Sequence, residues 1–327
     1  MATTDRHPTE GPATSAGSAP VRIVTASRRE DRDPPEAWES PASEADLAEL
    51  STRRFERLPH RPASATEVPA RALDALRLVV GDVGLEQLFV IPRSTRTVGS
   101  ARADWVLTPT EVIAVGSEAM GIWIDDADGP RVRALVPLTG VVAVLDRTVL
   151  LHGRLELVGP ERSIIVRYNT VGRPELRELL LPVRTSSQPV AGALPEGIGH
   201  DPATLPHKWM ALVRSSDVQP AGPDRLVVAA GDLWNPKPQL HDGVAVLSSR
   251  ELLVATDPTP DIEMAHYGVD LLAVARSRVR TIGGGGDTLV VTVADLPRDV
   301  EIRVSANPAL VAETIALLGP LVGTARS

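Results

Sequence analysis

The stretch Trp105-Val106-Leu107-Thr108-Pro109-Thr110-Glu111-Val112-Ile113 decides how the fold of this chain is interpreted. It contains two short apolar runs separated by Thr-Pro-Thr, a composition typical of two β-strands joined by a turn. Short apolar runs broken by turn residues continue to about Tyr168, and a second series of such runs begins at about Arg225. The sequence therefore predicts a mainly β protein.

The expected strands are short and rich in Val, Leu and Ile. In the first series they cover residues 88–92, 105–115, 121–124, 135–144, 148–151, 154–158 and 164–168. In the second series they cover residues 225–229, 244–255, 269–275, 279–282, 288–294 and 300–305. Helices are expected over residues 67–81, 173–183 and 308–318. The predicted fold class is therefore mainly β with capping helices (α+β).

The two series match each other in three places, which predicts an internal duplication. Residues 106–113 align with 246–253 at an offset of 140, residues 141–144 with 271–274 at an offset of 130, and residues 164–169 with 302–307 at an offset of 138. Both copies then enter an apolar helix directly after an asparagine, Asn169 or Asn307. The side chain of asparagine can accept a hydrogen bond from a free backbone N–H, so each is expected to cap its helix.

Several short antiparallel strands followed by one C-terminal helix resemble the pleckstrin-homology-like (PH-like) fold, and more closely its bacterial PH-like and GRAM-like members. Residues 105–113 resemble the strand–turn–strand start of such domains, and Leu138-Thr139-Gly140-Val141-Val142-Ala143-Val144 resembles their middle. The resemblance covers about two-thirds of the chain and includes no diagnostic motif. It implies two PH-like β-barrel or sandwich domains in tandem, a fold used for lipid binding, peptide binding and scaffolding.

Residues 1–65 are rich in Pro, Ser, Thr, Ala, Glu and Arg and show no sustained apolar period, so they are expected to be a disordered tail. Within this tail, residues 41–58 are compatible with a helix capped by Ser43, either docking on a partner or fluctuating without one. The expected division is a tail at 1–65, a helix plus a first PH-like domain at 66–185, a linker at 186–206 and a second PH-like domain at 207–327.

Composition limits the chemistry that the chain can perform. It contains no cysteine, which excludes disulfides, thiolate nucleophiles and zinc–thiolate sites. Its formal net charge is −8, and nucleic-acid binding depends on a basic surface, so no nucleic-acid partner is expected. The start lacks the apolar region of a signal peptide, and no stretch reaches the roughly 20 apolar residues of a membrane span. A cytoplasmic protein is expected, with peripheral attachment to a membrane as the alternative.

Arginines are concentrated in the first copy, where residues 131–184 contain 9 Arg against 5 acidic residues. Guanidinium groups bind phosphate and carboxylate well, so this cluster is a candidate site for an anionic headgroup. The alternative is that the arginines lie on alternate, solvated faces of the strands, and only strand register can decide between the two. The members of the cluster are Arg147, Arg154, Arg162, Arg167 and Arg173.

Three aromatic residues are further candidates for binding a partner. Tyr168 ends a strand before a turn, where it either forms a binding corner or packs at the sheet edge. Trp209 and Trp234 lie near the linker and look exposed, so they either dock the two domains on each other or anchor a protein interface.

Two other motifs are expected to carry no chemistry. The run Gly283–Gly286 lacks the Lys-Ser/Thr of a phosphate-binding loop, so it is interpreted as a hairpin turn. His200, His207 and His241 lie near aspartates but fit no metal-ligand spacing, so they are interpreted as solvated loop residues. No catalytic residue, cofactor or metal site is predicted.

The sequence favours a non-enzymatic binding or scaffold protein that acts through protein–protein contacts of two PH-like domains. The alternative is a peripheral membrane adaptor that binds anionic lipid headgroups through the arginine cluster, and a hydrolase built on the loop histidines ranks third. The residues expected to bind a ligand or partner are Arg147, Arg154, Arg167, Tyr168, Arg173, Trp209 and Trp234.

Overall fold

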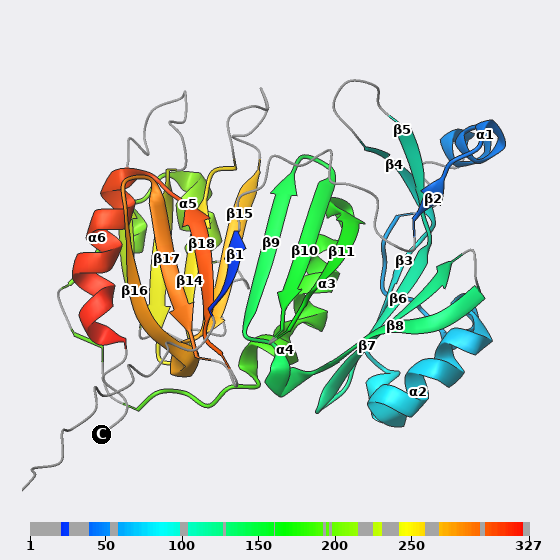
Figure 1. Cartoon of the computed structure of the whole chain (residues 1–327), viewed down its shortest axis with the longest axis horizontal. Helices are drawn as coiled ribbons and strands as arrows, with labels where there is room; N and C mark the ends of the chain where they lie inside the picture. The colour runs from blue at the N-terminus through cyan, green and yellow to red at the C-terminus, as the bar shows by residue number, and fades with distance from the viewer. Residues whose placement is uncertain are drawn as a thin grey trace, which may run out of the picture.

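The structure is a computed structural model, and it is mainly β with a few helices, which confirms the predicted α+β class (Figure 1). The structure describes residues 21–25, 39–52, 58–98, 104–126, 129–159, 161–191, 194–195, 198–214, 225–230, 242–258, 268–294 and 298–322. Within these ranges, no helix is long and apolar enough to cross a membrane.

The first half of the chain contains a helix, four antiparallel strands, three further strands and a closing helical segment. The helix α2 (Ala70–Gly84) is followed by β3 (Leu88–Ile91), β6 (Thr110–Val115), β7 (Ala119–Asp126) and β8 (Gly129–Pro137). These four strands form one sheet in the order β3-β6-β7-β8. The chain then passes through η2 (Leu138–Gly140), β9 (Ala143–Val149), β10 (His152–Val158), β11 (Ser163–Asn169), η3 (Thr170–Gly172), α3 (Arg173–Leu179) and α4 (Leu181–Thr185).

The second half repeats this order of elements. After η4 (Pro202–Thr204), α5 (His207–Arg214) is followed by β12 (Arg225–Ala230), β13 (Gly243–Ser248), β14 (Glu251–Thr256) and β15 (Val269–Ala275). The remaining elements are η7 (Arg276–Arg278), β16 (Val279–Gly285), β17 (Thr288–Val293), β18 (Val300–Ser305), α6 (Pro308–Leu318) and η8 (Gly319–Leu321). Apart from a hairpin inserted between β3 and β6 of the first half, each half therefore has a helix, four strands, a 3-10 turn, three strands and a closing helical segment.

One seven-stranded sheet joins the two halves, in the order β11-β10-β9-β15-β14-β13-β12. The joint is an antiparallel pair in which Val144 of β9 lies opposite Ala273 of β15. The hydrogen bonds between β9 and β15 thus make one sheet of the last three strands of the first half and the first four of the second half, and Figure 1 shows β9 beside β15 in the middle of the molecule. The halves are connected by backbone hydrogen bonds as well as by the segment between them.

Hydrophobic side chains cover both faces of the sheet β3-β6-β7-β8 and of strands β12 to β15 in the seven-stranded sheet. In the first half, Ala72 and Leu76 of α2 pack on Trp123 and its neighbours on one face, while the other face packs on β9, β10, β11 and α3. In the second half, α5 covers one face of β12 to β15, and the other face packs on β16, β17, β18 and α6. Because the sheets are covered on both sides, the strands can be nearly all apolar, as the sequence is.

The internal match holds at one of its three places. Residues 164–169 and 302–307 cover the last strand of each half and the asparagine after it, β11 with Asn169 and β18 with Asn307. Both asparagines cap as predicted, because Asn169 Oδ1 accepts from Val171 N at 3.0 Å and Asn307 Oδ1 accepts from Ala309 N at 2.9 Å.

The other two matches are wrong. Residues 106–113 span two strands that lie in different sheets, β5 (Asp104–Thr108) and β6, whereas residues 246–253 form the β13–β14 hairpin. The hairpin of the first half that occupies this place is β6–β7. Residues 141–144 and 271–274 contribute to β9 and β15, which pair with each other instead of occupying equivalent places in the two halves.

The β4–β5 hairpin projects from the first half together with residues 40–52 (Figure 1). It comprises β4 (Ser94–Val98) and β5, and β2 (Ser40–Pro41) pairs with β5. The helix α1 (Glu44–Thr52) follows, within the predicted 41–58 stretch. Its cap is the predicted Ser43, whose Oγ accepts from Asp46 N at 3.2 Å while Ser43 N donates to Asp46 Oδ2 at 3.0 Å.

The prediction of a disordered tail over residues 1–65 is wrong for its described parts. Besides β2 and α1, residues Arg22–Thr25 form β1, which pairs in parallel with β18 near the other end of the chain. Four residues are too few to show a period, and the pairing partner is distant in sequence, so no local pattern indicates this strand. Residues 1–20 and 26–38 lie outside the described residues.

Candidate functional site

Strand register brings three of the predicted arginines to one face of the central sheet. Arg154 on β10 lies opposite Arg147 on β9 and Arg167 on β11. The row continues across the joint between the halves, since Asp270 on β15 lies opposite Arg147. Arg173 lies elsewhere, at the start of α3. The cluster is therefore a row of three arginines on one face, with Arg173 apart.

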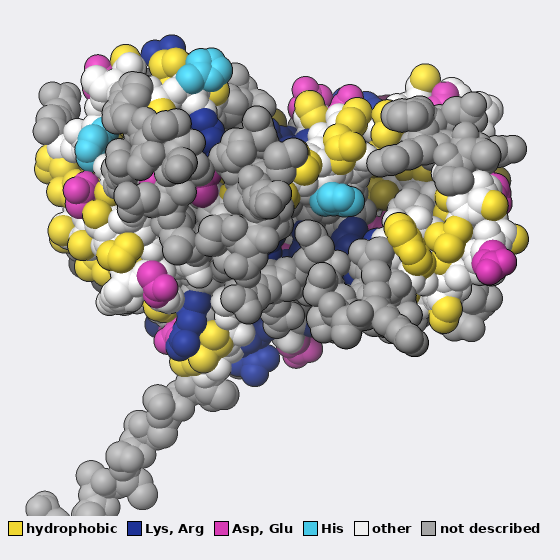
Figure 2. Space-filling view, turned by 90° about the horizontal axis from the view of Figure 1, so that it is seen from above, with side chains coloured by type: hydrophobic (Ala, Val, Ile, Leu, Met, Phe, Trp, Pro, Cys, Tyr) yellow, Lys and Arg dark blue, Asp and Glu magenta, His cyan; other side chains and the backbone are white. Residues whose placement is uncertain are grey.

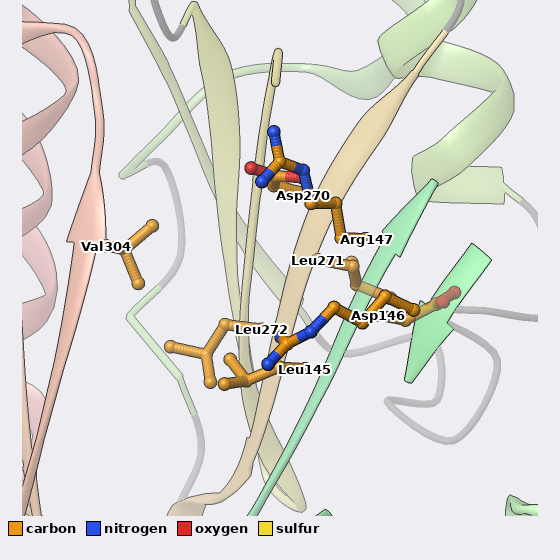
Figure 3. A pocket seen from close by; sticks show the side chains of 8 residues that line it. Leu145, Asp146, Arg147, Asp270, Leu271, Leu272 and Val304 are labelled. Atoms are coloured by element: carbon orange, nitrogen blue, oxygen red, sulfur yellow. The ribbon is translucent and has the colours of Figure 1, made fainter. Parts of the chain in front are cut away.

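Each of two arginines in this row faces a carboxylate. Arg147 Nε lies 3.4 Å from Asp270 Oδ1, and the two side chains are only 13% and 8% exposed. Arg154 Nη1 donates to Glu156 Oε2 at 2.9 Å. Arg147, Arg154 and Asp270 line a small hollow between the sheet and Val304 of β18. Figure 3 shows Arg147 beside Asp270, with Leu145 and Leu272 pointing toward Val304.

Burial raises the pKa of Asp270 to about 6, against the opposing effect of Arg147. Asp146 adds to the rise in pKa and Arg154 reduces it. The carboxyl group is therefore poised to change its protonation in mildly acidic solution. What the row can do chemically is hold charges in pairs within the fold, because the guanidinium groups of Arg147 and Arg154 already contact carboxylates of the protein itself.

Arg173 and Tyr168 meet on the opposite side of the sheet, around Asp146. Arg173 Nε donates to Asp146 Oδ2 at 3.0 Å, and the Tyr168 hydroxyl donates to Asp146 Oδ1 at 2.5 Å. Tyr168 is buried, and burial together with the Asp146 charge raises its pKa well above its usual value. Its ring lies over Gly153, where a Cβ would come within 2.4 Å of it. Tyr168 therefore packs against the core from β11, the edge strand of the sheet, which agrees with the predicted packing at the sheet edge and not with a binding corner.

The two tryptophans do not form an exposed pair in the described structure. Trp209 is buried with Leu212 and Val213 of α5 on the strands of its own half, with Lys208 Nζ 4.8 Å from its ring centroid. It belongs to the core of the second half, so the prediction that it is exposed and docks the two halves is wrong. The sequence showed only that it was near a linker, whereas Trp209 lies on the face of α5 that packs on the strands. Trp234 lies outside the described residues.

The glycine run and the histidines show no catalytic geometry in the described chain. Gly285 of β16 pairs with Thr288 of β17, and Gly286 has a φ of +59°, which confirms the hairpin turn. His200 Nδ1 accepts from Ala229 N at 3.2 Å, and His207 opens α5. His241 lies outside the described residues. Among the residues described, no three His, Asp or Glu side chains are arranged to hold a metal.

An exposed apolar surface at the tip of the β9–β10 hairpin was missed by the sequence analysis. Leu150, Leu151 and Val171, here called the hairpin tip, are 44%, 50% and 51% exposed. Thr170 holds them together, because its N–H donates to Leu151 O at 3.1 Å and its hydroxyl to Leu150 O at 2.5 Å. Figure 2 looks onto this end of the molecule and shows hydrophobic side chains on it.

Leu150 is also strained. Its φ of +51° is left-handed, and among the described residues other than glycine it alone has a positive φ. The signal was present in the sequence: Leu150 and Leu151 form a two-residue hairpin loop, a place where Asn and Gly are strongly preferred.

A buried ion pair between the halves was also missed. Arg184 of α4 contacts Glu251 of β14 with two hydrogen bonds, Nε to Oε2 at 3.2 Å and Nη2 to Oε1 at 2.5 Å. The two side chains are only 8% and 3% exposed. This pair fixes the C-terminal helix of the first half to the second half.

Comparisons with known proteins add no assignment, because no protein-family model matches the chain and no curated protein matches it.

Proposed function

We propose that the protein is a non-enzymatic binding or scaffold protein whose two PH-like domains, fused through one sheet, act through protein–protein contacts. The order of four strands, a 3-10 turn, three strands and a helix in each half supports the PH-like assignment. The single observation that carries the proposal is the hairpin tip, Leu150, Leu151 and Val171.

The hairpin tip combines exposed apolar side chains with a strained backbone, and the fold itself requires neither. Exposed apolar side chains gathered in one place are typical of interaction sites. A non-glycine residue in the left-handed region costs about 1–2 kcal/mol, and Leu150 could be replaced by Gly or Asn without changing the turn. A strained, exposed leucine at a turn is explained by a partner that buries it, since strain of this kind concentrates at functional sites.

The strain at the hairpin tip should be visible in the stability of the protein. Leu150→Gly should leave the free energy of unfolding unchanged or raise it by up to about 1 kcal/mol, because glycine adopts a φ of +51° without strain. Urea denaturation followed by circular dichroism measures this. The control is Leu181→Gly on α4, a similarly exposed leucine that should instead lose stability. A loss of more than about 1 kcal/mol in Leu150→Gly would show that the fold itself needs this leucine.

The function itself is tested by crosslinking in the native cell. A photo-reactive amino acid placed at Leu151 should yield discrete protein adducts, which disappear when Leu150→Asp is added. The matched position is Leu78 on the outer side of α2, which is 89% exposed and should yield no such adducts. The proposal fails if the adducts from position 151 are the same as those from position 78.

The membrane adaptor predicts salt-dependent binding to anionic lipid through the arginine row. We expect no co-sedimentation with anionic or zwitterionic vesicles at low or high salt, because Arg147 and Arg154 face Asp270 and Glu156 within the fold. Binding to anionic vesicles alone, lost at high salt and in the Arg154→Ala/Arg167→Ala double variant, would replace the scaffold proposal by the adaptor.

A further inference from the structure

The strand β1 extends a sheet of the second half from the far end of the chain. It adds to the edge of β18 in parallel, with Arg22 opposite Val300 and Val24 opposite Ile302. Arg22 N also donates to Asp299 O at 3.1 Å. Figure 1 shows β1 as a short blue arrow beside β18. The pair is only four residues long, so few backbone hydrogen bonds hold it.

Alternate side chains of β1 play different parts. Val24 is 7% exposed and packs in the core of the second half. Ile23 points the other way and is 53% exposed. Val24 therefore fills an apolar socket, while the preceding Ile23 stays on the surface.

Arg22 contacts the first half of the chain. Its Nη2 donates to Ser163 Oγ at 2.8 Å, and its Nη1 donates to the carbonyl oxygen of Gly159. Both acceptors lie at the β10–β11 turn. The place that β1 occupies is thus built from both halves: a strand edge and an apolar socket from the second, and two oxygen acceptors for a guanidinium group from the first.

This combination has the parts of a peptide-binding site. Addition of an extended peptide to a sheet edge obtains affinity from backbone hydrogen bonds and specificity from pockets for alternate side chains. Here the pockets select an arginine and, two residues later, a small β-branched apolar side chain. Thirteen residues separate Thr25 from Glu39, the next described residue, and an extended chain of that length reaches up to about 45 Å.

We propose that the edge of β18 is a binding site for an extended peptide of the pattern Arg-x-Val, and that residues 22–25 occupy it as an internal ligand that a partner peptide displaces. The inference goes beyond the proposed function and is independent of the hairpin tip. A partner segment competes with β1 for the same hydrogen bonds, socket and acceptors.

The test uses the full chain and a fluorescent peptide with the sequence of residues 19–27, followed by fluorescence anisotropy. Val24→Ser in the protein weakens the internal ligand, so the variant should bind the peptide at least tenfold more tightly than the unmodified protein. The matched control is Ile23→Ser, which changes the exposed neighbour and should leave binding unchanged. A peptide carrying Asp in place of the valine that corresponds to Val24 should not bind.

A reversible disulfide between β1 and β18 tests the same proposal if Val24→Ser unfolds part of the protein. The chain has no cysteine, and Ile23 lies directly opposite Glu301, about 5 Å away in neighbouring strands, so Ile23→Cys/Glu301→Cys can form one disulfide. Peptide binding should fall at least tenfold on oxidation and return on reduction. Equal binding by the oxidised and reduced forms would overturn the proposal. A disulfide-linked dimer on oxidation would also overturn it, because β1 would then come from a second copy.

Discussion

Replacing Arg184 with alanine should lower the free energy of unfolding by about 3–5 kcal/mol. The reason is burial: Glu251 is 3% exposed, and both of its oxygens accept from the guanidinium group of Arg184. Removing the arginine leaves a carboxylate in an environment where water cannot replace the lost partner. Urea denaturation of the full chain, followed by circular dichroism, measures the change.

Two comparisons show whether the effect comes from the buried charge. The double variant Arg184→Met/Glu251→Leu removes both charges and should recover most of the lost stability, because a buried pair can often be replaced by apolar side chains at little cost. Arg303→Ala breaks a half-exposed pair with Glu301 and should cost at most about 1 kcal/mol. Equal losses for Arg184→Ala and Arg303→Ala would contradict the assignment of a buried pair.

The same variant tests how the halves are coupled. Arg184 belongs to α4 in the first half and Glu251 to β14 in the second, and the two halves also share the β9–β15 ladder. If the shared sheet makes the halves one cooperative unit, the variant should unfold in a single transition at lower urea. Two separated transitions would show that the halves unfold independently.

The parts of the fold that could be predicted from the sequence are those that depend on residues close to one another in the chain. The capping by Ser43, Asn169 and Asn307 needed only a side chain and an N–H two or three residues away. The Gly286 turn needed only a positive φ. Strands and helices of the right type follow from the same local rules, which is why the fold class was predicted correctly.

Pairing between strands could not be predicted, because it is decided by partners that are distant in sequence. Residues 106–113 and 246–253 look alike, yet Pro109 separates strands of two different sheets while Ser249 and Arg250 turn a hairpin. Pro109 has no N–H to give to a ladder, which makes it a suitable point for the chain to change sheets. The pairing of β9 with β15 and of β1 with β18 depends in the same way on the whole fold.

The candidate site shows the same limit. The arginine cluster was visible in composition, but only register shows that Arg147, Arg154 and Arg167 share a face and that Arg173 does not. Asp270, which contacts Arg147, lies on β15 in the other half of the chain. Glu156, which contacts Arg154, lies on the same strand as its partner. The hairpin tip was the part that sequence could have revealed, since two leucines replace the usual turn residues there.

The pH dependence of stability should reveal the environment of Asp270. Burial raises its pKa to about 6 in the folded protein, from about 3.8 when exposed. The folded state therefore holds a proton between these values that the unfolded state has released, and stability falls as pH rises from about 4 to 6. Over this window the group lowers the free energy of unfolding by about 3 kcal/mol, and its effect no longer changes at higher pH.

The measurement is the difference in the free energy of unfolding between the unmodified protein and Asp270→Asn across pH 4 to 7. Asparagine removes the titration and also deprives Arg147 of its anion, so the variant has a constant offset and the slope is the quantity that matters. Asp299→Asn, which breaks a more exposed pair with Arg280, controls for the loss of a carboxylate near the surface. A flat difference curve for Asp270→Asn would mean that water reaches this carboxylate through the hollow facing Val304. The joint between β9 and β15 would then be wet, and the stability of the fused sheet would rest on its backbone ladder and on the Arg184–Glu251 pair instead.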